Sequence, residues 1–288
     1  LVIRHYEQPA ARRHLWLGVI MAGVALAFGI EQAMHWFAAH PMAATGLQAS
    51  LLAGLATGLG AIPVLFLRRP SEDLMAPMLG LAGGMMLAAS LFSLLVPAVQ
   101  TVATSAAPWL LGLATAGALL AGTAVMQRMD RRTPHAHIEA VEGSGRQPQV
   151  ALVVVAIALH NVPEGLAVGV AAASGADHGM SLGIAIQNVP EGWIVASAML
   201  ALGAAPLRAA LIALGTGLVE PVGGLFGVIA SSVAGAALPL ALAAAAGAML
   251  WVVSHELIPA AHRPGRETAG SAGLLTGFAL MTMLAVGL

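Results

Sequence analysis

The sequence has no cysteine and no lysine, and charged residues make up only 9% of its 288 residues. Without cysteine the chain can form neither a disulfide bond nor a thiolate metal site, so imidazole, carboxylate, amide and thioether groups remain as ligands. A soluble domain carries roughly 25% charged residues. The shortage of charge, together with 59% hydrophobic residues, predicts an all-α polytopic membrane protein that has the lipid bilayer as its partner and binds no nucleic acid.

Long apolar segments follow one another along the chain, and each is near or above the ~20 residues needed to cross the hydrocarbon core. The first is too long for the apolar region of a signal peptide, and a sequence that begins at Leu1 is expected to continue upstream. The nine predicted spans are about 14–37, 43–67, 74–100, 106–127, 150–173, 179–202, 206–232, 236–258 and 268–288.

The positive charges test this topology, because all twelve are arginine and nine spans place every one of them on the same side. The positive-inside rule makes that side cytoplasmic. We therefore predict a cytoplasmic tail (1–13), a cytoplasmic loop (128–149), an inside N-terminus and an outside C-terminus. The arginines are at positions 4, 12, 13, 68, 69, 128, 131, 132, 146, 208, 263 and 266.

A hexapeptide occurs twice, at His160–Gly165 (HNVPEG) and Gln187–Gly192 (QNVPEG). The histidine or glutamine of each copy lies four residues before the glutamate, so the two share a helix face. Each proline lacks an N–H, frees a carbonyl one turn earlier and is expected to bend its helix. The copies lie on consecutive, antiparallel spans, which indicates an inverted repeat with a binding site near the bilayer midplane.

Glu164, Glu191 and Glu220 lie well inside predicted spans, with no lysine or arginine at the same depth. Each costs roughly 2.5–3.5 kcal/mol at the bilayer centre. Protonation, hydrogen bonding or a bound cation could compensate this cost. Three protonated, bracing glutamic acids are one alternative. We favour a cation, because His160, Asn161, Gln187 and Asn188 add the imidazole and amide groups of a site for Zn²⁺, Mn²⁺, Fe²⁺, Co²⁺ or Cd²⁺.

Enzyme motifs are weak in this sequence, and we predict that the protein is not an enzyme. His255-Glu256 lacks the second histidine of the His-Glu-x-x-His motif of metalloproteases. Gly179–Gly183 fits the Gly-x-Ser-x-Gly pattern but lies at the start of a span, without the strand-to-helix turn that this motif needs. His135 and His137 are either solvated residues of loop 128–149 or weak collectors of metal.

These motifs, with Glu220-Pro221, Gly84–Ser90 and Ser254–Glu256 followed by His262-Arg263, resemble those of the ZIP (Zrt-/Irt-like) family of divalent metal transporters. The bacterial zinc- and cadmium-transporting branch is the most similar. The resemblance covers 43–288 and implies an eight-helix core with internal inverted symmetry, to which 14–42 adds an extra N-terminal helix. It also implies a homodimer in the bacterial inner membrane and elevator-type movement of the site-bearing helices against a scaffold built from 74–127 and 236–288.

The resemblance also implies which side chains bind the metal. The transport site would use six residues, and a second metal would share the glutamates with two asparagines. The six are Met86, His160, Glu164, Gln187, Glu191 and Glu220, and the two asparagines are Asn161 and Asn188. Residues expected at the cytoplasmic exit are His255, Glu256 and His262; a polar helix end at the membrane surface is an equal alternative for them.

Two positions depart from the family pattern. Asn188 stands where relatives carry a carboxylate, so a second metal should bind weakly or not at all. Arg266 stands where relatives carry a histidine, which puts a metal-release step there in doubt. The sequence predicts transport of Zn²⁺ or a similar divalent ion into the cytoplasm, with the metal as cargo and no prosthetic group. The alternative is a proton- or sodium-coupled transporter of another substrate, in which the buried carboxylates relay the coupling ion.

Overall fold

A computed structural model of the chain describes residues 21, 24, 27–29, 31, 32, 34–66, 72–131, 146–174, 178–233 and 237–287. Contacts divide the chain into two units, residues 1–44 and residues 45–288. In the first unit the described residues are helical over 34–39, and α2 begins at Pro41. The predicted tail 1–13, the first part of the predicted extra helix, and the loop histidines His135 and His137 lie outside the described residues.

Every regular element in the described ranges is a helix, which confirms the predicted all-α class. Two of the elements are π-helical turns, at Ser90–Leu95 and Val253–Leu257, and Ile62–Leu65 is a short 3₁₀ helix. The α-helices are α2 (Pro41–Ala61), α3 (Glu72–Ala89), α4 (Val96–Ala103), α5 (Pro108–Asp130), α6 (Arg146–Ser174), α7 (His178–Ala201), α8 (Pro206–Gly217), α9 (Glu220–Val233), α10 (Ala237–Val252), α11 (Ile258–Ala261) and α12 (Glu267–Gly287).

Six stretches of the described residues are long and apolar enough to cross a membrane, which confirms a polytopic membrane protein. The helices α6 and α7, with 29 and 24 residues, also reach the length that crossing the hydrocarbon core requires. The count of nine spans and the orientation stay predictions. The six stretches are Pro41–Leu65, Asp73–Ala103, Pro108–Asp130, Pro206–Ser231, Leu238–Ala261 and Glu267–Ala285.

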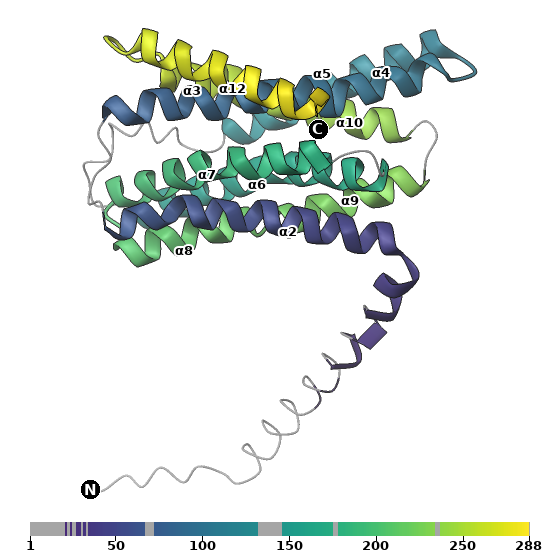
Figure 1. Ribbon diagram of the computed structural model, residues 1–288, viewed down its shortest axis with the longest axis horizontal. Helices are drawn as coiled ribbons and strands as arrows, with labels where there is room; N and C mark the ends of the chain where they lie inside the picture. The colour runs from purple at the N-terminus through teal and green to yellow at the C-terminus, as the bar shows by residue number, and fades with distance from the viewer. Residues whose placement is uncertain are drawn as a thin grey trace, which may run out of the picture. The chain divides into compact units, whose positions relative to one another are not determined.

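The helices of the second unit form two groups (Figure 1). The first group contains α3, α4, α5, α10 and α12, and its main packing pairs are α3 with α12 and α5 with α10. The second group contains α2, α6, α7, α8 and α9, with α6 packed along α9. The groups meet where α3 contacts α7 and α10 contacts α6. Met85, Ile184 and Leu242, which belong to one buried cluster, lie in this hydrophobic core.

The prolines of the two motifs and Pro221 have different positions in their helices. Pro163 and Pro190 lie inside α6 and α7, which stay continuous through the two motifs. The predicted span 206–232 contains two helices, because α8 ends at Gly217 and α9 begins at Glu220, directly before Pro221. A proline that cannot donate to the preceding turn favours such a break. The helical backbone is therefore interrupted directly before Glu220.

Candidate metal site

Both hexapeptide motifs lie in the second group of helices, where the motif glycines allow very close packing. A Cβ atom added at Gly165 would overlap the backbone carbonyl of Glu220, and one added at Gly192 would overlap the carbonyl of Thr57. Close approach of backbones through glycine is typical of helix pairs in membranes. The packing brings the polar residues of α6 and α7 next to α9 and α2.

The first polar contact in this region joins the two motifs. Gln187 Nε2 donates a hydrogen bond to Glu164 Oε1 at 2.5 Å, and both side chains are fully buried. The remaining oxygens, Glu164 Oε2 and Gln187 Oε1, have no hydrogen-bond partner within the described structure. One oxygen of each group is therefore available to a ligand.

The second polar contact links three helices through Asn188. Its Nδ2 donates to Glu220 Oε1 at 2.6 Å and to the backbone carbonyl of Ala53, on α2, at 2.7 Å. Glu220 Oε2 and Asn188 Oδ1 are buried without a partner among the described residues, as are both polar atoms of the Asn161 side chain. Unsatisfied buried polar atoms are costly and call for an explanation, such as a bound ion.

The third glutamate, Glu191, lies within electrostatic range of both Glu164 and Glu220. The three carboxyl groups are therefore near enough to influence one another's charge, and their role as metal ligands stays a prediction. In the described part of the chain, however, no three His, Asp or Glu side chains are arranged so that they could hold one metal ion. Gln187 and Asn188 each hold one oxygen of Glu164 and Glu220, and the other oxygens would have to be brought around a common point for a cation to bind.

Met86 and His160 have their described contacts with other residues. Met86, on α3, is buried in the hydrophobic core between the groups, and its backbone carbonyl accepts a hydrogen bond from Ser90 Oγ. His160 Nε2 lies 3.9 Å from Glu256 Oε1 of the π-helical turn that follows α10. His160 therefore connects the motif on α6 with a second polar cluster on the other group of helices.

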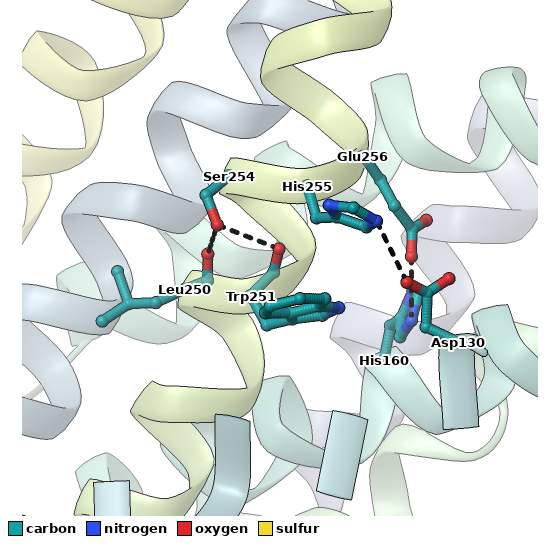
Figure 2. Close-up of polar contacts among 7 residues, drawn as sticks. All are labelled: Asp130, His160, Leu250, Trp251, Ser254, His255 and Glu256. Carbon is teal, nitrogen blue, oxygen red and sulfur yellow. Dashed lines mark hydrogen bonds and ion pairs between the residues drawn. The ribbon is translucent and has the colours of Figure 1, made fainter. Parts of the chain in front are cut away.

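That second cluster contains Asp130, His160, His255 and Glu256 (Figure 2). His255 Nε2 lies 3.3 Å from Asp130 Oδ2, and the imidazole stacks on the indole of Trp251 at a centroid distance of 4.7 Å. The side chains of Asp130 and His160 are 9% and 11% exposed, whereas those of His255 and Glu256 are 47% and 40% exposed. The cluster thus runs from the buried region toward the surface.

Sequence reasoning missed Asp130, which it assigned to the loop beginning at residue 128. The structure continues α5 to Asp130 and starts α6 at Arg146, so both helices are longer than predicted. Glu256 and His255 lie together as expected, but His262 differs. Its Nδ1 donates to the Ile258 carbonyl at 2.8 Å and its Nε2 accepts from Ser271 Oγ at 2.9 Å, so both ring nitrogens are already engaged.

These observations define a polytopic helical membrane protein with a buried carboxylate and amide site. Residues 127–285 match the family model for the ZIP zinc transporter. The chain is 47% identical to the zinc transporter GufA of Myxococcus xanthus over 84% of this chain and 98% of that protein. It is 42% identical to the zinc transporter ZIPB of Bordetella bronchiseptica, over 80% of this chain and 76% of that protein.

A further relative, the zinc transporter ZupT of Corynebacterium efficiens, is 33% identical over 81% of this chain and 93% of that protein. The chain therefore belongs to the ZIP zinc transporter family. Members of this family are membrane transporters and not enzymes, in agreement with the sequence-based expectation.

Proposed function

We propose that the protein carries divalent transition-metal ions, with Zn²⁺ as the main cargo, across a bacterial inner membrane into the cytoplasm. The relatives are named zinc transporters, which supports this cargo. The observation that carries the proposal is the burial of Glu164 and Glu220, whose partners in the described structure are neutral amides. A cation that binds there compensates the cost of the buried carboxylates.

The transport site uses Glu164, Glu191, Glu220 and His160, with Gln187 and Met86 completing the ligand set. Among the described residues the Gln187 side-chain oxygen has no hydrogen-bond partner. When a metal ion binds, the Gln187 amide turns so that this oxygen, and not the nitrogen, faces the ion. Glu164 then binds the ion instead of the amide. Carboxylate, amide oxygen and imidazole are ligands that Zn²⁺ and its neighbours accept.

A second metal would bind between the glutamates, Asn161 and Asn188. Asn188 contributes an amide in place of a carboxylate, and its Nδ2 already donates to Glu220. A neutral ligand attracts a divalent ion less than a carboxylate does, so occupancy of this second position is low. The site therefore carries one metal per transport cycle.

The metal leaves through the cluster shown in Figure 2. His160 borders both the motif and Glu256, so ligand exchange passes the ion from the glutamates to Glu256, His255 and Asp130. The arginines on the predicted cytoplasmic side include Arg128 and Arg131, near Asp130 in sequence, which supports an inward exit. His262, engaged by Ile258 and Ser271, braces α11 against α12.

Alternating access arises when the second group of helices, which bears the motifs, slides against the first group. The division into these groups supports this elevator-type proposal, because the predicted scaffold 74–127 and 236–288 corresponds to α3–α5 and α10–α12. The related packing of the two motifs supports an inverted repeat. Two such chains form a homodimer through the scaffold.

Zinc uptake into proteoliposomes that contain a Zn²⁺-sensitive dye tests the proposal. Glu191→Gln should abolish uptake, while Glu267→Gln, which removes an exposed carboxylate at the start of α12, should transport as the wild type does. Zn²⁺ uptake that persists in Glu191→Gln would overturn the site assignment. A proton or sodium flux that Glu191→Gln abolishes, without any Zn²⁺ signal, would show that the carboxylates relay a coupling ion.

A further inference from the structure

The motif on α6 packs against α9 through two backbone contacts. Gly165 faces the carbonyl of Glu220, and Gly223 faces the carbonyl of Val162. In both cases an added Cβ would overlap the facing oxygen. Val162 and Gly165 are three residues apart on α6, and Glu220 and Gly223 are three residues apart on α9. The two contacts together therefore fix how α6 and α9 lie against each other.

The motif on α7 packs against α2 through the same pair of contacts. Gly192 faces the carbonyl of Thr57, and Gly60 faces the carbonyl of Val189. Gly192 and Val189 are the motif counterparts of Gly165 and Val162. Thr57 therefore occupies on α2 the place that Glu220 occupies on α9, and each of the two residues is followed three positions later by the contacting glycine.

The hydroxyl of Thr57 is buried and has no hydrogen-bond partner among the described residues. Hydroxyls in membrane helices usually donate to the carbonyl four residues earlier, and many in this protein do so. For Thr57 that carbonyl belongs to Ala53 and already accepts a hydrogen bond from Asn188. The helical hydroxyls that do bond to the carbonyl four residues earlier include those of Ser50, Ser90, Thr101, Thr123, Ser231, Ser254 and Thr282.

Thr57 also lies beside the candidate metal site. It follows Ala53 by one helical turn, and Asn188 joins the Ala53 carbonyl to Glu220. On its other side, a Cβ added at Gly217 would lie 2.7 Å from Thr57 Oγ1, and Gly217 ends α8 directly before the break that leads to Glu220. The Thr57 hydroxyl, Glu220 Oε2 and Asn188 Oδ1 are thus three buried oxygens, unpartnered within the described residues, on helices that the Asn188 amide joins.

We propose that Thr57 belongs to the metal site and that its hydroxyl supplies a neutral oxygen ligand from α2 to the divalent cation. This inference rests on the proposed function. With Thr57, four helices of the second group contribute metal ligands, namely α2, α6, α7 and α9. A hydroxyl is a hard oxygen ligand, so Thr57 favours Zn²⁺ and harder divalent ions over the softer Cd²⁺.

Calorimetric titration of the purified full chain with Zn²⁺ provides the first test. Thr57→Val removes the hydroxyl at constant size and should weaken Zn²⁺ binding about 10-fold, the lower end of the loss seen when a group supporting a metal site is removed. Thr57→Ser should bind as the wild type does. The matched control is Thr115→Val on α5, because Thr115 is also a buried hydroxyl without a partner in the described structure. Equal losses in both valine variants, or no loss in Thr57→Val, would overturn the proposal.

Thr57→Cys provides a second test, and it does not depend on how well the valine variant folds. The sequence has no cysteine, so this variant carries a single thiol. Thiolate is a soft ligand, so Cd²⁺ should produce a Cd–thiolate charge-transfer band in the ultraviolet, and Cd²⁺ affinity should rise relative to Zn²⁺. Thr115→Cys should show neither change. Absence of the band in Thr57→Cys would overturn the proposal.

Glu220→Gln separates this inference from the proposed function. If Glu220→Gln weakens Zn²⁺ binding and Thr57→Val leaves it unchanged, the metal site stands and Thr57 does not belong to it. If Glu220→Gln binds Zn²⁺ as tightly as the wild type, the proposed site itself fails, and the role of Thr57 as its ligand fails with it.

Discussion

Asn188 holds Glu220 in place, with its Nδ2 donating to Glu220 Oε1 at 2.6 Å inside a fully buried region. The same nitrogen donates to the Ala53 carbonyl, so a single amide ties α7 to both α9 and α2. A carboxylate at position 188 could not donate these hydrogen bonds. We therefore expect Asn188, at a position where a carboxylate is expected in relatives, to stabilise the metal-free protein.

Asn188→Asp should lower the thermal stability of the metal-free protein and raise the number of metals bound. The substitution removes both hydrogen bonds and adds a fourth carboxylate beside the glutamates. Metal should then restore more stability than it does in the wild type, because a ligand that binds the folded state stabilises it. Thermal unfolding and metal stoichiometry, each with and without Zn²⁺, measure these effects. An unchanged stoichiometry would contradict this view of Asn188.

Gln187→Leu should destabilise the metal-free protein by about 1–3 kcal/mol, the cost of leaving a buried acceptor without its donor. The acceptor is Glu164 Oε1, at 2.5 Å from Gln187 Nε2. Leucine has a similar size, so loss of volume contributes little. Thermal unfolding in detergent measures the change, and the double variant with Glu164→Leu should regain part of the loss. If the double variant is as unstable as the sum of the single variants, the two residues do not interact.

Asp130→Asn should slow metal release while Zn²⁺ affinity at the glutamates stays close to that of the wild type. Asp130 contacts His255 in the exit cluster (Figure 2), outside the region where the glutamates converge. The maximal rate of uptake should fall several-fold, and calorimetric Zn²⁺ affinity should change little. Glu267→Gln serves again as the control for loss of a carboxylate. A large loss of affinity in Asp130→Asn would place Asp130 in the primary site.

Zinc binding should release protons and weaken as the pH falls. Carboxylates bind metal only when they are deprotonated, so protons compete with Zn²⁺ for Glu164, Glu191 and Glu220. Affinity is therefore highest at neutral or higher pH and decreases toward acidic pH. Calorimetry in two buffers with different ionisation enthalpies counts the released protons. Glu191→Gln should release fewer of them, and an unchanged count would exclude Glu191 as the group that loses a proton.

Gly165→Ala should lower stability by about 3 kcal/mol or more, at the upper end of the range for overpacked cores. The added Cβ would overlap the backbone carbonyl of Glu220, which cannot move away by rotation of a side chain. Gly117→Ala on α5 is the control, because its Cβ would have no neighbour within 4 Å. Thermal unfolding of both variants measures the difference. Equal stability would show that α6 and α9 are farther apart than the structure places them.

The sequence was informative about the residues of the candidate site because buried charge in a membrane protein stands out against an apolar background. The repeated hexapeptide and Glu220 were visible in this way, and the three glutamates are within electrostatic range of one another. Asp130 was missed because it ends an apolar helix beside a loop, where an acidic residue needs no special explanation. Only the packing of α5 against α10 shows that it faces His255.

Thr57 could not be predicted either, since a lone threonine in a membrane helix normally satisfies its own hydroxyl within the helix. Thr57 departs from this rule because the expected acceptor, the Ala53 carbonyl, already accepts a hydrogen bond from Asn188. Asn188 is 131 residues later in the sequence. The positions of helix breaks were also hidden. The prolines at 163 and 190 are accommodated within continuous helices, whereas the one at 221 follows a break.

The glycine contacts within the two groups of helices differ in kind from a glycine contact between the groups. Within the second group, Gly165 and Gly192 press against carbonyls of neighbouring helices; within the first, Gly84 meets the carbonyl of Leu274. Such contacts between main chains have no side chain that could yield, so each group is stiff. Between the groups, Gly183 instead meets the flexible side chain of Met281. A methionine can change rotamer, so this contact between α7 and α12 can yield where the backbone contacts within each group cannot, as the proposed sliding of the two groups requires.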